Sequence, residues 1–188
     1  MLKMANLYHA LSKLLICMLA LALADCTTMV AHNTAEPYLH NQEKRDKLQQ
    51  LAVQYCQVKQ SKSGQKQAPS MPDYPFTTDG CSRWPDESWV ACCIVHDITY
   101  WCGGSEKNRE ETDRIITHCI NKKAPPLGGV MYPGVRVGGS PWLPTPWRWG
   151  YGWKKWPKGY QISDSRKSIH SILEELNIFE IVEKQLKD

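Results

Sequence analysis

Six of the eight cysteines in this 188-residue chain lie between residues 56 and 119, and two of them, Cys92 and Cys93, are adjacent. Cysteines at this density are either crosslinked or bound to metal, and the cellular compartment decides which. Paired zinc ligands usually stand about two to four residues apart in turns. An adjacent pair inside an apolar, helix-forming stretch therefore favours disulfides over a zinc cluster.

The N-terminus carries an export signal. Residues 1–13 contain Lys3 and Lys13 and no acidic residue. They precede an eleven-residue apolar run that ends in Ala22-Leu23-Ala24. This run is too short for a permanent membrane anchor, and its basic flank and small-residue end are typical of a signal peptide. We therefore predict a signal peptide over residues 1–24 and, because periodicity is lacking, a flexible tether over residues 25–40.

Signal cleavage removes Cys17 and leaves seven cysteines, an odd number for a chain in an oxidising compartment. Cys26 directly follows the apolar run, in a context that resembles a bacterial lipoprotein cleavage site. Two alternatives follow. Either Cys26 is lipidated and six cysteines form three disulfides, or cleavage is ordinary and Cys26 is free or pairs between molecules. The protein is expected to be periplasmic, secreted or a cell-envelope lipoprotein.

Composition excludes several classes. A content of 42% hydrophobic and 22% charged residues argues against disorder, collagen and a multi-span membrane protein. The 23 Lys and Arg residues against 19 Asp and Glu give a net charge of +4, too small and dispersed to indicate nucleic acid. We predict no nucleic-acid partner and no obligate protein partner.

Residues 41–124 have the pattern of a helical core. Apolar residues recur at helical spacing over Asn41–Gln60, and Glu87–Trp101 contains no Gly or Pro and is expected to be a buried helix. Gly103-Gly104 ends that helix, and Ser105 is a suitable N-cap for a helix that runs to Lys123. The short connection predicts that the last two helices are antiparallel neighbours.

The chain changes character after this core. Residues 125–160 are rich in Trp, Pro and Gly and predict irregular structure, with a short hairpin around Val130–Val137. Residues 161–188 contain one amphipathic helix from Asp164 to Lys187, which we expect to pack on its own domain.

Five tryptophans crowd the extension together with basic residues, and two uses are weighed, since no motif supports a third, stacking on sugars or single-stranded nucleic acid. They could form an interfacial patch on a lipid membrane, or they could cover the domain's own helices, which we favour for most of them. These residues are Trp142, Trp147, Trp149, Trp153 and Trp156.

One histidine lies where it can act as a base. His96 and Tyr100 are four residues apart and share a helix face, while Asp97 is turned away by about 100°. Asp113 lies on the antiparallel neighbour, within reach of His96. A histidine held by a carboxylate is the arrangement that orients an imidazole for general-base work.

A second group of residues suits a hard cation. Asp79 and Gly80 offer a carboxylate and a backbone that a ligand can approach closely. If Cys81 is bridged to Cys93, one helical turn before Asp97, the two carboxylates come together. Two carboxylates with a backbone carbonyl suit calcium better than zinc.

These residues carry a family resemblance. Thr78-Asp79-Gly80-Cys81-Ser82, Pro85-Asp86 and Cys92-Cys93-Ile94-Val95-His96-Asp97-Ile98-Thr99-Tyr100 together resemble the core of the secreted phospholipase A2 superfamily, most closely its bacterial and fungal branch. The likeness covers roughly residues 77–120, and the chain after Lys123 has no counterpart in it. The implied fold is mostly α, with a pair of antiparallel disulfide-linked helices, the irregular extension and a C-terminal helix.

The resemblance implies a mechanism. His96 would activate a water, Asp113 would orient His96, and Tyr100 would support Asp113. Asp79, the Gly80 carbonyl and Asp97 would hold Ca²⁺, which would polarise the sn-2 ester of a glycerophospholipid at a membrane surface. The alternative is a non-catalytic module of the same fold that binds lipid or another envelope component.

The resemblance also bears on the disulfides and on one competing function. It implies a bridge between Cys81 and Cys93. For Cys92, Cys119, Cys56 and Cys102 the partners are not fixed, although we favour Cys92 with Cys119.

A metal-dependent phosphohydrolase using His96, Asp97 and His118 would need more His and Asp residues at helical positions, so we interpret His118 as a helix-surface residue.

Overall fold

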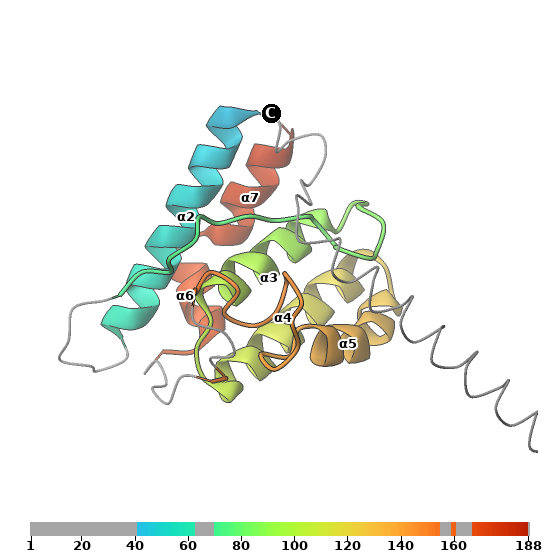
Figure 1. The fold of residues 1–188 in the computed structure, drawn as a ribbon. Helices are drawn as coiled ribbons and strands as arrows, with labels where there is room; N and C mark the ends of the chain where they lie inside the picture. The colour runs from blue at the N-terminus through green and yellow to red at the C-terminus, as the bar shows by residue number, and fades with distance from the viewer. Residues whose placement is uncertain (1–40, 63–69, 155–158, 161–166, 188) are drawn as a thin grey trace, which may run out of the picture. The chain divides into compact units, whose positions relative to one another are not determined.

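The computed structural model describes residues 41–62, 70–154, 159–160 and 167–187, and within them the protein is mostly helical, as expected (Figure 1). The predicted signal peptide, the tether and the possible lipidation at Cys26 lie outside these residues, as does Trp156. Of the helices described, none combines the length and the apolar character that crossing a membrane requires.

The described part of the chain contains six helices. In chain order they are α2 (Gln42–Ser61), α3 (Val90–Cys102), α4 (Glu106–Lys123), α5 (Leu127–Gly138), α6 (Ile169–Glu175) and α7 (Ile178–Lys187).

Helix α3 is the centre of the fold. Every residue from Ala91 to Cys102 is buried, in agreement with the mostly apolar character of this stretch. Helix α4 lies along one side of α3 and also contacts α5, while α2 and α7 contact α3 elsewhere (Figure 1). The surface of α3 that carries His96 is thus enclosed by its neighbours.

The turn between α3 and α4 follows the sequence prediction closely. Gly103 ends α3 at a φ of +71°, a left-handed conformation that favours glycine. The Ser105 hydroxyl then accepts the Asn108 backbone N–H while the Asn108 side chain accepts the Ser105 N–H, a capping box that starts α4. This turn reverses the chain and aligns α4 against α3.

Three disulfides attach other segments to α3. Cys81 pairs with Cys93 and Cys92 with Cys119, as expected, and Cys56 pairs with Cys102, which the sequence had left open. The adjacent residues Cys92 and Cys93 point in different directions on the helix and therefore anchor α4 and the preceding loop separately.

The predicted hairpin around Val130–Val137 is wrong, because this segment lies within helix α5 even though Pro133 is inside it. Its β-branched residues and glycines suggested strands, but tertiary contacts override that preference. A Cβ at Gly128 would come within 2.2 Å of the Thr117 carbonyl oxygen, so the glycine allows α5 to approach α4 closely. The Gly128 N–H also donates to the Asn121 side chain at 2.8 Å.

The single helix predicted over Asp164–Lys187 is also a partial error. Residues 161–166 lie outside the described residues, and the rest forms α6 and α7, separated at Asn177, whose φ is +49°. Asparagine tolerates this left-handed conformation better than most residues, so it can end one helix and redirect the chain. The apolar stripe packs on the protein's own core, as expected, through Ile169, Ile172, Leu173, Ile178 and Val182.

Two tryptophans of the extension are structural. Trp149 and Trp153 are buried, and their indole N–H groups donate to the carbonyls of Gly104 and Cys102 at 2.9 and 2.8 Å. These bonds satisfy carbonyls at and beyond the C-terminus of α3, where a helix leaves them without partners. Trp142, by contrast, is 61% exposed.

Candidate functional site

His96 lies on α3 with each ring nitrogen near a different carboxylate. Its Nε2 is 3.0 Å from Oδ1 of Asp113 on α4, and its Nδ1 is 3.9 Å from Oδ1 of Asp97 on its own helix. The short turn between α3 and α4 makes the first contact possible. An ionised Asp113 can only accept a hydrogen bond, so in the neutral imidazole Nε2 carries the proton and Nδ1 carries the lone pair.

Asp113 is fully buried, but its hydrogen-bonding partners favour the ionised form. Burial raises its pKa, but the hydrogen bond and charge of His96, followed by the hydrogen bonds of Arg136 and Tyr100, hold the pKa below its ordinary value. The Tyr100 hydroxyl donates to Oδ1 of Asp113 at 2.7 Å, and Arg136 donates to Oδ2 at 2.6 Å. The structure thus brings together the three residues that the sequence assigned to catalysis.

The pKa of His96 is raised. Burial acts to lower it, but the hydrogen bonds and charges of Asp113 and Asp97 outweigh burial because both favour the protonated ring. The ring also packs against that of Tyr100, with centroids 4.1 Å apart. His96 is therefore a basic imidazole with a fixed orientation.

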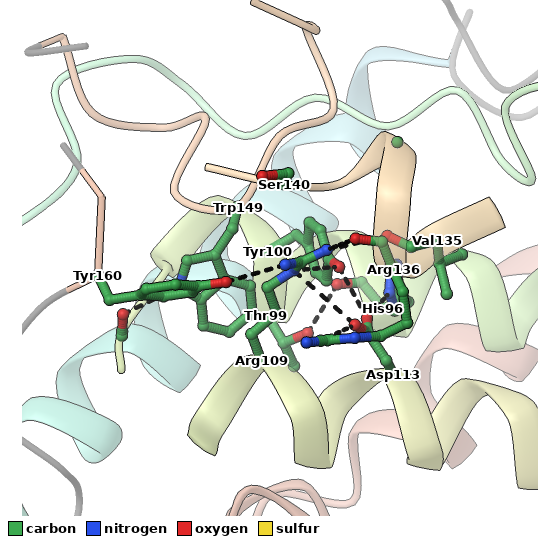
Figure 2. A network of polar contacts seen from close by, with 12 residues as sticks. His96, Thr99, Tyr100, Arg109, Asp113, Val135, Arg136, Ser140, Trp149 and Tyr160 are labelled. Atoms are coloured by element: carbon green, nitrogen blue, oxygen red, sulfur yellow. Dashed lines mark hydrogen bonds and ion pairs between the residues drawn. The ribbon is translucent and has the colours of Figure 1, made fainter. Parts of the chain in front are cut away.

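A second set of contacts surrounds this group (Figure 2). The buried Arg109 donates to the hydroxyls of Tyr100 and Tyr160 at 3.1 and 2.9 Å, and also to the backbone carbonyls of Val135 and Arg136. Arg109 therefore links α4 to the C-terminal end of α5.

The loop before α3 positions the other predicted ligands. The Thr78 hydroxyl donates to Oδ2 of Asp97 at 2.6 Å and accepts the Gly80 N–H at 3.1 Å. Gly80 has a φ of +68°, and a Cβ there would collide with the Asp86 carboxylate. Asp86 in turn accepts the Cys81 N–H at 2.8 Å, so the Cys81–Cys93 disulfide and this bond fix the loop beside α3.

The electrostatics of Asp97 are compatible with a cation beside it. Burial raises its pKa to about 6, and the charge of nearby Asp79 adds to the rise, while His96 and Thr78 oppose it. Two carboxylates close enough to repel each other are stabilised by a divalent cation, and carboxylate and carbonyl oxygens are donors that suit calcium. Within the described ranges no cluster of three His, Cys, Asp or Glu side chains could hold a metal, so backbone oxygens and water would have to complete such a site.

An apolar cavity of about 210 Å³ lies over His96 and Asp97. Its walls come from the loop at Gly80–Trp84, from α3, from Ile116 of α4 and from one face of α5, with Trp147 from the extension. Most of its surface is apolar, and its polar lining side chains are Ser82, Arg83, His96, Asp97 and Tyr100. An apolar cavity on which a few polar groups converge is typical of a site for a small organic ligand.

Sequence reasoning missed several residues of the site. Arg109 stands four residues before Asp113 on the same helix, a spacing that could have identified it as a partner. Arg136 gave no such signal, because it falls within the hairpin predicted around Val130–Val137. His118 is exposed on α4, in agreement with its interpretation as a surface residue.

Comparisons with protein families, with curated proteins and with solved structures return no match for this chain.

Proposed function

We propose that this protein hydrolyses the sn-2 ester of glycerophospholipids, using calcium and a water activated by His96. The observation that carries the proposal is the His96–Asp113 pair at 3.0 Å beneath the apolar cavity. The phospholipase A2-like order of the motif residues supports the same reaction, as does a mostly helical core crosslinked through α3.

The chemistry required of His96 is proton transfer in two directions. Its Nδ1 takes a proton from a water, whose oxygen adds to the ester carbonyl carbon and leaves the negative charge on the carbonyl oxygen. As the bond to the glycerol oxygen breaks, His96 returns the proton to that oxygen. The products are a fatty acid and a lysophospholipid, and no covalent enzyme intermediate is needed.

Asp113 serves this reaction by holding the Nε2–H and stabilising the positive imidazolium that forms. Tyr100 fixes the same carboxylate oxygen, so the imidazole and the carboxylate stay aligned. Asp79, Asp97 and the Gly80 carbonyl are the residues that would hold calcium. When bound, the cation would supply positive charge to the developing oxyanion.

The cavity supports a lipid substrate. An apolar space bounded by Met131, Ile116 and two tryptophans, Trp84 and Trp147, offers a hydrocarbon chain a favourable environment away from water. Trp84 and Trp147 line this space without filling it, which favours a ligand-binding cavity over a packed core.

The test is release of fatty acid from mixed phospholipid vesicles, first with Ca²⁺ and then with excess chelator. We expect release that depends on calcium and that falls at least roughly 100-fold in His96→Asn, the range typical of losing a general base. His118→Asn, an exposed histidine on the neighbouring helix, is the matched control and should keep full activity.

The other outcomes separate the alternatives. Full activity in His96→Asn would contradict the mechanism. No release, together with retained binding of calcium and vesicles, would favour the non-catalytic lipid-binding module instead.

A further inference from the structure

Helix α5 belongs to the part of the chain that follows the phospholipase-like motifs, yet it contributes a charged group to the centre of the site. Arg136, near its C-terminal end, donates from Nη1 to Oδ2 of Asp113 at 2.6 Å (Figure 2). The Asp113 side chain has no exposed surface, whereas that of Arg136 is 25% exposed. Arg136 is therefore a cation that reaches from the surface into the buried pair.

The two oxygens of Asp113 have different partners. Oδ1 accepts from His96 and Tyr100, while Oδ2 has Arg136 as its hydrogen-bond donor, with Arg109 Nε farther away at 3.8 Å. A carboxylate turns about a single bond, so two oxygens held in different directions fix the plane of the group. Removing the contact at Oδ2 leaves the plane restrained from one side only.

The backbone that carries Arg136 is itself held. Arg109 donates to the carbonyls of Val135 and Arg136, so the cation on α4 fixes the position from which Arg136 extends back to α4. Each helix thus supplies an arginine to the other, and Asp113 lies between the two.

We propose that Arg136 is a positioning residue for His96, acting through Asp113. It keeps Oδ1 directed at Nε2 and thereby keeps the imidazole aligned with the cavity. For catalysis this inference rests on the proposed function, but the alignment of the ring does not depend on which reaction, if any, occurs.

The first measurement is therefore independent of activity. The hydrogen-bonded Nε2 proton of His96 is expected as a downfield proton NMR signal at a fixed pH, assigned by its loss in His96→Asn. We expect the signal to weaken or disappear in Arg136→Gln and Arg136→Met and to be retained in Arg136→Lys, which keeps a cationic donor. Arg114→Gln, which removes an exposed arginine of α4 paired with Glu110, should leave it unchanged.

The second measurement is steady-state hydrolysis. We expect kcat to fall by up to roughly 100-fold in Arg136→Gln with KM nearly unchanged, the size of effect that misplacement of a catalytic group can produce. Arg136→Lys should recover a large part of this loss.

Two results would overturn the inference. One is an unchanged ring-proton signal in a folded Arg136→Gln or Arg136→Met variant. The other is a loss of this signal in Arg136→Lys as large as the loss in those two variants. Absence of hydrolysis in the unsubstituted protein would count against the proposed function alone, because the NMR comparison would still decide the role of Arg136.

Discussion

Single side chains help to hold the C-terminal end of the central helix, and Trp153 is one of them. Its indole donates to the Cys102 carbonyl, while the backbone N–H groups of Gly150 and Gly152 donate to the carbonyls of Tyr100 and Trp101. A Cβ at Gly152 would come within 2.6 Å of the Trp101 ring, so the segment depends on glycine to lie this close. These bonds hold the end of α3 that carries Tyr100.

We predict that Trp153→Phe lowers the free energy of unfolding by about 1–3 kcal/mol, because it keeps most of the apolar contact but leaves the Cys102 carbonyl without this donor. Trp142→Phe, at an exposed position, should change it by less than about 0.5 kcal/mol. Urea unfolding monitored by circular dichroism gives both values. Equal effects of the two substitutions would contradict the structural role of the Trp153 indole.

At the scale of elements, α5 supplies both a polar contact to Asp113 and a wall of the cavity. Gly134 is one of its cavity-lining residues, and a Cβ there would meet nothing within 4 Å. Gly129 is equally open on the same helix but does not line the cavity. The same substitution at Gly134 and at Gly129 therefore separates the effect of filling the cavity from the effect of changing helix propensity.

We predict that Gly134→Leu reduces hydrolysis of long-chain phospholipids more than that of short-chain ones, because the new side chain occupies part of the cavity. Gly129→Leu should leave chain-length preference unchanged. Both should keep or raise the melting temperature, since replacing glycine inside a helix favours it by up to about 1 kcal/mol. A series of vesicles that differ only in acyl length provides the measurement, and a uniform loss across the series would argue that the cavity does not take the acyl chain.

At the scale of the whole molecule, two of the three disulfides have different roles. Cys56–Cys102 closes a sequence separation of 46 residues and joins α2 to the end of α3, whereas Cys81–Cys93 closes 12 residues and fixes the loop that carries Asp79. The chain-entropy model assigns about 4 kcal/mol to the longer closure and about 3 kcal/mol to the shorter one.

We therefore predict that two double variants, each lacking one of these disulfides, differ in which property they lose most. Cys56→Ala with Cys102→Ala should cost more stability, while Cys81→Ala with Cys93→Ala should cost more calcium affinity and activity. Thermal unfolding and calcium titration on both proteins test this. If the variant without Cys81 and Cys93 bound calcium as tightly as the unsubstituted protein, the loop at Asp79 would not be part of a cation site.

The local rules of the sequence predicted the central part of this protein well. An apolar stretch without Gly or Pro became α3, Gly103-Gly104 with Ser105 became the turn to α4, and the spacing of His96, Tyr100 and Asp113 placed them within reach across two antiparallel helices. These features depend on neighbours a few residues away, or on one short connection, and such interactions can be inferred from the order of residues alone.

Contacts between distant segments were decided only by the tertiary structure. The helical segment α5 approaches α4 closely at Gly128, and its C-terminal carbonyls accept hydrogen bonds from Arg109 on α4. Arg136 reaches Asp113 for the same reason, from 23 residues along the chain. Intrinsic preferences differ by only about 1 kcal/mol per residue, so burial and long-range hydrogen bonds can reverse them, and the sequence by itself contains no local signal of that reversal.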